Sequence, residues 1–164
     1  MIVHDPAPED LPYLRRCVVL ARHALEVGNE PFGSLLMLDD AVLFEDFNHV
    51  STGDDTRHPE FAIARWAAEN LTPEQRLAAV VYTSGEHCPM CAAAHAWVGL
   101  GRIVYATSSI QLVQWRREWG LPDGPVSPLP IGAVAPGVIV SGPAPELLDE
   151  VRALHASYAG DAPA

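Results

Sequence analysis

The sequence has few cysteines, few basic side chains and no long apolar run, and each shortage excludes a class of protein. Three cysteines among 164 residues do not suggest a disulfide framework; free, metal-bound or catalytic thiols in a reducing compartment are expected instead. No stretch reaches the about 18 consecutive apolar residues of a membrane span, and residues 1–10 lack the basic start of a signal peptide. We therefore expect a cytoplasmic protein with no membrane partner.

Basic residues are outnumbered two to one by acidic residues. The chain has 10 Lys and Arg against 21 Asp and Glu, which gives a formal net charge of −11. Such a charge repels a phosphate backbone. The basic pair Arg116-Arg117 is typical of a solvated helix face. Nucleic acid is therefore not expected as a partner.

The apolar content is sufficient for one domain. The chain is 49% hydrophobic over 164 residues, which suits a single core. No internal repeat divides it, and the long Pro- and Gly-rich connection over residues 121–137 is a loop within the domain. We expect residues 1–164 to form a single domain.

Apolar spacing predicts helices alternating with strands. Residues 11–27 repeat apolar side chains every three or four positions, as one face of a helix does. Two strands, 31–38 and 41–48, flank a tight turn at Asp39-Asp40. A helix opens over 58–60, with Asp55 or Thr56 as its expected cap. The remaining expectations are strands at 77–84, 102–107 and 137–141 and helices at 88–100, 110–120 and 145–158. Alternation after residue 77 implies βαβ units and a largely parallel sheet.

Two of the cysteines, Cys88 and Cys91, are separated by only two residues. Such a pair is typical of a thioredoxin-like redox site, of half a zinc site, or of a chance pair in a core. A second polar group, His58-Pro59-Glu60, also stands just inside a helix start. A dithiol exchanger has no evident use for it, whereas zinc explains both groups together.

Zinc would take two thiolates, from Cys88 and Cys91, and an imidazole nitrogen from His58. Three protein ligands leave one tetrahedral position open for water, as in a catalytic site. Two thiolates neutralise the charge of the ion, so a neighbouring base is needed, and Glu60 stands where it should be. A rival interpretation adds His95 as a fourth ligand and closes a structural, non-enzymatic zinc site.

His58-x-Glu60 followed by Cys88-x-x-Cys91 resembles the zinc-dependent cytidine deaminase superfamily, over roughly residues 30–106. The resemblance implies a three-layer α/β fold, with a mixed five-stranded sheet and helices on both faces. It also implies hydrolytic deamination: Glu60 takes a proton from the zinc-bound water, the hydroxide attacks the ring carbon bearing the amine, and Glu60 passes protons to a ring nitrogen and to the departing ammonia. Relatives commonly form dimers, so a homodimer is expected.

Two residues depart from the family pattern. Between the histidine and the glutamate the family usually has a small residue whose N–H can bind substrate, but Pro59 has no N–H. Before the first cysteine the family commonly has proline, and here stands His87. That histidine either reaches into the pocket to read the base or transfer a proton, or is a loop histidine at a helix start.

The helical segment 109–120 allows the last two strands to be parallel. This resembles the branch of guanine, cytosine, deoxycytidylate and tRNA adenosine deaminases. With tRNA disfavoured by charge, we expect a free nucleobase, a nucleoside or a related small aminated heterocycle, with guanine leading; cytosine and tRNA adenosine remain alternatives. Asn48 would read the base edge, and Phe32, Trp115 or Trp119 would stack on the ring or fill the core.

Overall fold

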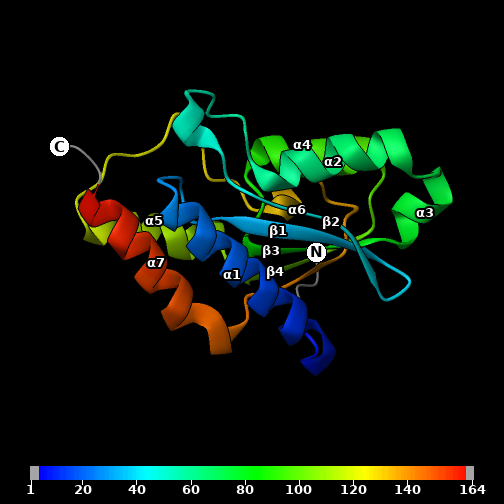
Figure 1. The fold of residues 1–164 in the computed structure, drawn as a ribbon, viewed down its shortest axis with the longest axis horizontal. Coiled ribbons are helices and arrows are strands. Elements are labelled where there is room, and N and C mark those ends of the chain that lie inside the picture. Colours follow the sequence, from blue (N-terminus) through cyan, green and yellow to red (C-terminus); the bar gives the residue numbers. More distant parts are fainter. Residues whose placement is uncertain (1–3, 162–164) are drawn as a thin grey trace.

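The computed structural model describes residues 4–161, which form one five-stranded mixed sheet between two layers of helices (Figure 1). The strand order is β2-β1-β3-β4-β5. β1 pairs antiparallel with β2 and β3, whereas β3, β4 and β5 are parallel to one another. The strands are β1 (Gly33–Leu38), β2 (Ala41–Phe47), β3 (Val80–Gly85), β4 (Arg102–Thr107) and β5 (Val140–Ser141). The predicted mixed sheet and the parallel last two strands are confirmed.

Helices cover both faces of the sheet. On one face, α1, α5 and α7 pack around a core that includes Leu14, Val18 and Leu147. On the other face, α2 packs against α4, and Ile63 and Val81 are buried between these helices and the sheet. In Figure 1 the sheet runs between α2 and α4 above and α1 and α7 below. The bounds are α1 (Leu11–Glu26), α2 (Pro59–Asn70), α3 (Pro73–Ala78), α4 (Pro89–Val98), α5 (Ser109–Glu118), α6 (Ile131–Val134) and α7 (Leu148–Asp161). None of the described helices is both long and apolar enough to cross a membrane.

The turn between β1 and β2 is the tight turn expected from Asp39-Asp40. Both residues have positive φ, 49° and 61°. Two consecutive left-handed residues match the twist of a two-residue hairpin, and aspartate tolerates this region better than most residues. The local sequence is therefore sufficient to reverse the chain here.

Three local expectations were wrong. A short helix, α3, occupies the start of the expected strand 77–84, because Thr72 and Gln75 form a capping box and Pro73 suits the first helical position. Helix α6 lies within the connection predicted to be a loop. The cap of α2 is His58 itself, whereas Thr56 donates to Asp54.

Candidate metal centre and active site

Two helices that begin at the same place bring three metal-ligand side chains together. His58 is the N-cap of α2, Cys88 is the N-cap of α4, and Cys91 follows in the first turn of α4. The Nδ1 atom of His58 lies 3.5 Å from the Cys88 sulfur and 3.6 Å from the Cys91 sulfur. The two sulfurs are 3.5 Å apart. Over residues 4–161 no other trio of His, Cys, Asp or Glu side chains is grouped closely enough to hold a metal.

These separations fit one tetrahedral zinc ion. With usual zinc–sulfur and zinc–nitrogen lengths, a tetrahedron places two sulfurs about 3.8 Å apart and a sulfur and a nitrogen about 3.6 Å apart. The observed spacings differ by only a few tenths of an ångström. The donor set, two thiolates and an imidazole nitrogen, is also one that zinc prefers. His58, Cys88 and Cys91 would therefore hold Zn²⁺ and leave a fourth position open.

The site favours the charged form of one thiol even before a metal binds. The hydrogen bond with Cys91 and then that with His58 lower the pKa of Cys88 to about 4, against the opposing effect of burial. The hydrogen bond with Cys88 raises the pKa of His58 to about 9. Helix N-termini also stabilise negative charge. A thiolate, the form that binds metal, is thus available at neutral pH.

Glu60 is buried next to this group, with 5% of its surface exposed. Its Oε1 atom lies 2.7 Å from the hydroxyl of Ser34 on β1 and 2.9 Å from that of Thr83 on β3. Burial raises the pKa of Glu60, whereas these two hydroxyls and the charge of His58 oppose the rise. Ser34 and Thr83 were missed by sequence reasoning; the available signal was a hydroxyl residue inside each apolar strand run.

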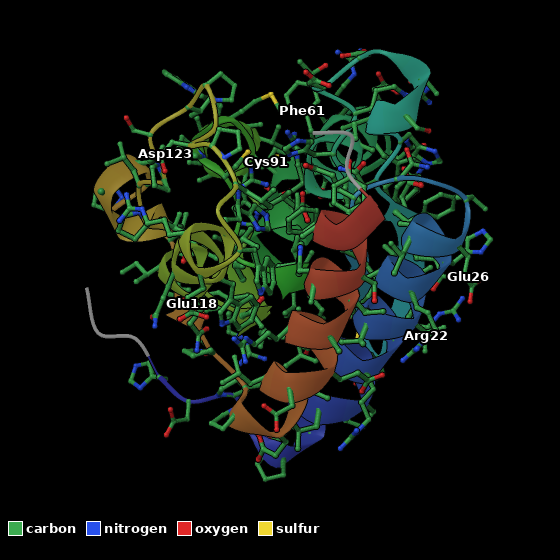
Figure 2. All side chains as sticks on the ribbon, turned by 90° about the vertical axis from the view of Figure 1, so that its left-hand side faces the viewer. Arg22, Glu26, Phe61, Cys91, Glu118 and Asp123 are labelled. Atoms are coloured by element: carbon green, nitrogen blue, oxygen red, sulfur yellow. The ribbon has the colours of Figure 1, made fainter. Side chains whose placement is uncertain are left out.

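A cavity of about 810 Å³ opens over the metal-ligand group. His58, Glu60 and Cys88 contribute to its wall. Further wall residues come from the segment just before β1, from α5, from the connection that follows α5, and from the last turns of α7. Figure 2 shows Cys91 and, on that connection, Asp123. The final helix therefore lines the cavity, through His155, Tyr158 and Ala159.

The aromatic residues proposed for substrate stacking separate into two groups. Phe32 and Trp119 line the cavity, and the ring of Phe32 contacts that of His155, with centroids 4.9 Å apart. Trp115 is 6% exposed, belongs to the core on the α1 face and is not part of the cavity wall. Its ring centroid lies 6.4 Å from that of Trp119, so it supports the wall from behind.

Asn48, His87 before α4 and His95 within α4 lie outside the cavity wall. Asn48 is fully buried; its Oδ1 atom accepts the N–H of Val50 at 3.0 Å, and its Nδ2 atom has no partner among the described residues. His87 is buried against His95, with ring centroids 5.4 Å apart. The Nε2 atom of His95 lies 2.9 Å from the carbonyl oxygen of Gly101. His95 is thus not grouped with the three metal ligands.

Comparison with known proteins places this geometry among deaminases. Residues 8–107 match the family described as cytidine and deoxycytidylate deaminase zinc-binding region. Over 113 residues the chain is 29% identical to the "Probable cytosine deaminase" of Schizosaccharomyces pombe, covering 68% of each protein. Over 96 residues it is 36% identical to guanine deaminase of Bacillus subtilis, covering 57% of this chain and 62% of that one. Over 94 residues it is 35% identical to the tRNA-specific adenosine deaminase of Agrobacterium fabrum, with the same two coverages.

A solved structure agrees with the sequence comparison. The X-ray structure of guanine deaminase from Bacillus subtilis superimposes with a TM-score of 0.57 and 31% identity, over 66% of this chain and 69% of that one. The matched segments thus span about three fifths to two thirds of the relatives' own lengths. The three relatives differ in the ring that their names give as substrate.

Proposed function

The chain belongs to the cytidine and deoxycytidylate deaminase family, and from this premise we propose that it is a zinc-dependent hydrolytic deaminase of a small aminated heterocycle, with guanine as the leading substrate. The observation that carries the proposal is the group of His58, Cys88 and Cys91, whose spacings fit one zinc ion. Glu60 faces the same cavity. This arrangement supplies a metal and a carboxylate to one bound ring.

In the proposed reaction the zinc supplies Lewis-acid activation of a water molecule. Glu60 accepts a proton from the attacking water and returns protons to a ring nitrogen and to the departing ammonia. Ser34 and Thr83 hold its Oε1 atom in place. Burial keeps bulk water away from the carboxylate and strengthens the electrostatic interactions in the pocket.

Phe32 and Asn48 are proposed substrate contacts. Phe32 offers a ring face in the wall, on which a flat heterocycle can stack. The unpartnered Nδ2 atom of Asn48 is a buried donor, and buried donors generally have a partner. A base oxygen would provide one after a small rearrangement of the wall. Trp115 and His87 are proposed to act from behind the wall, by fixing its neighbours.

Guanine is the leading substrate because of one matched relative and because of the charge and size of the cavity. Guanine deaminase of Bacillus subtilis is among the matched proteins, at 36% identity. Glu30, Asp55 and Glu86 are among the carboxylates of the wall, which disfavours a polyanion such as tRNA. A cavity of about 810 Å³ also falls within the usual range for small-molecule sites.

The test is ammonia release by zinc-loaded protein offered guanine, cytosine, adenine and their nucleosides. One strong signal is expected, and Glu60→Gln should abolish it while one zinc per chain remains bound. Turnover that survives Glu60→Gln would remove the proposed role of this residue. Silence across the whole panel would contradict the proposed substrates.

We also propose that residues 1–164 act as one domain in a homodimer in the cytoplasm. Exposed apolar side chains gather around a second hollow that is lined by Leu77, Trp97 and Ile139, which are 72%, 91% and 64% exposed. Such surfaces often mediate association. The free cysteines agree with a reducing compartment. Sedimentation analysis should give twice the chain mass, and Trp97→Asp should shift the protein toward the monomer.

A further inference from the structure

Glu30 occupies a fixed position in the wall of the cavity, just before β1. The N–H of Phe32 donates to the carbonyl oxygen of Glu30 at 2.8 Å. On the other side, the N–H of Asn29 donates to Ala24 at 2.8 Å, and its side-chain oxygen accepts the N–H of Ser51 at 2.8 Å. The backbone is therefore held on both sides, and the Glu30 side chain starts from a rigid turn.

The carboxylate of Glu30 is half-buried, yet it has neither a hydrogen bond nor an ion pair within residues 4–161. Burial raises its pKa, and the charges of His58 and Arg116 lower it. The guanidinium of Arg116 donates instead to the carbonyl oxygen of Pro122 at 3.1 Å. Because a half-buried carboxylate without a partner is costly, its oxygens are acceptors available to a ligand in the cavity.

We propose that Glu30 is a specificity-determining residue that accepts a hydrogen bond from an N–H group of the substrate ring other than the amine that leaves. This inference rests on the proposed function. An ionised carboxylate can only accept hydrogen bonds, so the ring must carry a second donor. Free guanine and free cytosine have ring N–H groups. The base of adenosine in RNA has none besides its amine, so Glu30 disfavours adenosine in RNA.

The size of the effect follows from the kind of bond. A hydrogen bond to a charged group contributes about 1.5 to 3 kcal/mol, and a site built around such a bond rejects ligands that lack the partner. Glu30→Met keeps the length of the side chain and removes both carboxylate acceptors. We expect this variant to lower kcat/KM for guanine about 100-fold, without loss of zinc.

The experiment measures ammonia release from guanine, 1-methylguanine and 9-methylguanine. It compares wild-type protein with Glu30→Met and with Glu69→Met, a matched control on the exposed side of α2. One of the two methylations should lower wild-type kcat/KM about 100-fold. The same methylation should change the Glu30→Met value less than threefold, because the methylation and the substitution remove the same bond. The control should match the wild type with all three bases. Zinc content is measured for each protein.

The inference can fail in two ways, and only one of them also contradicts the proposed function. If the wild type deaminates guanine and the kcat/KM of Glu30→Met is within threefold of it, Glu30 does not bind the ring and the proposed function stands. The same conclusion follows if each methylation lowers kcat/KM by the same factor in the wild type and in Glu30→Met. If the wild type releases no ammonia from guanine, the proposed substrate fails, and the inference fails with it.

Discussion

The carboxylate of Glu86 accepts a hydrogen bond from the backbone N–H of Ile131, 45 residues further along the chain, at 2.9 Å. Its other oxygen accepts the N–H of Ser109 at 2.8 Å. One side chain thus joins the first residues of α5 and α6. The connection between these helices forms part of the cavity wall. Glu86 lies two residues before Cys88, so it links the wall to the segment that carries the proposed metal ligands.

Replacing Glu86 by Ala should loosen this wall. Two backbone N–H groups at helix starts lose a charged acceptor, which should lower the free energy of unfolding by about 2 kcal/mol. KM should rise several-fold, whereas the bound zinc should remain. Denaturant titration and steady-state kinetics check these changes, with Glu69→Ala on the exposed side of α2 as the control. An unchanged KM would show that the connection keeps its place without Glu86.

Ser34→Ala should slow the reaction without affecting the metal. The hydroxyl lies 2.7 Å from Glu60 Oε1, and its loss leaves Thr83 as the one hydroxyl donor to this atom among the described residues. A hydrogen bond worth about 1.4 kcal/mol corresponds to a tenfold fall in kcat. Kinetics and zinc analysis of Ser34→Ala beside Ser51→Ala, on the surface, separate this effect from general damage. A fall in zinc content would contradict the positioning role.

His95→Ala should keep its zinc. The ring bonds to the carbonyl oxygen of Gly101 and packs on His87, so the closed structural site is not supported by the geometry. Metal analysis should find one zinc per chain in His95→Ala and none in His58→Ala. Loss of zinc from His95→Ala, in protein that remains folded by circular dichroism, would restore the structural-zinc hypothesis.

Arg102→Met should destabilise the fold near the start of α1. Asp10 is fully buried and accepts from Arg102 at 2.6 Å and from the Tyr82 hydroxyl at 2.8 Å. Removing one partner of a buried charge costs about 3 to 5 kcal/mol, and about 2 to 3 kcal/mol is expected here because Arg102 is partly exposed. Arg22→Met breaks an exposed pair with Glu150 and should cost less than about 1 kcal/mol. Denaturant unfolding compares the two.

Acid should destabilise the protein partly through His155. Burial lowers the pKa of this histidine to about 3, so between pH 6.5 and 3 the unfolded chain binds the proton more readily than the folded chain does. The contribution of this pKa difference to the free energy of unfolding is fully present above about pH 6.5. It is lost as pH falls, by at most about 1.4 kcal/mol per pH unit.

Thermal unfolding across this range should therefore show a weaker pH dependence in His155→Phe than in wild type. Phenylalanine keeps the aromatic contacts with Phe32 and Trp115. The exposed His23→Gln serves as the control. An identical pH dependence in His155→Phe and the wild type would show that His155 does not contribute to destabilisation by acid.

The sequence by itself predicted the strands, the main helices and the proposed metal ligands, because these depend on local patterns. Apolar periodicity marks the strands and main helices, Asp39-Asp40 reverses the chain, and the spacing within His58-x-Glu60 and Cys88-x-x-Cys91 fixes which side chains share a helix start. Only the tertiary structure decided which side chains surround the cavity proposed to bind the substrate ring. Glu30 and Ser34 are far in sequence from Thr83 and Glu86, and packing of β1, β3, α5 and α7 around one cavity brings the two pairs together. Trp115 and Trp119 both pack on the core of the α1 face, and only the tertiary structure shows that Trp119 also lines the cavity whereas Trp115 does not.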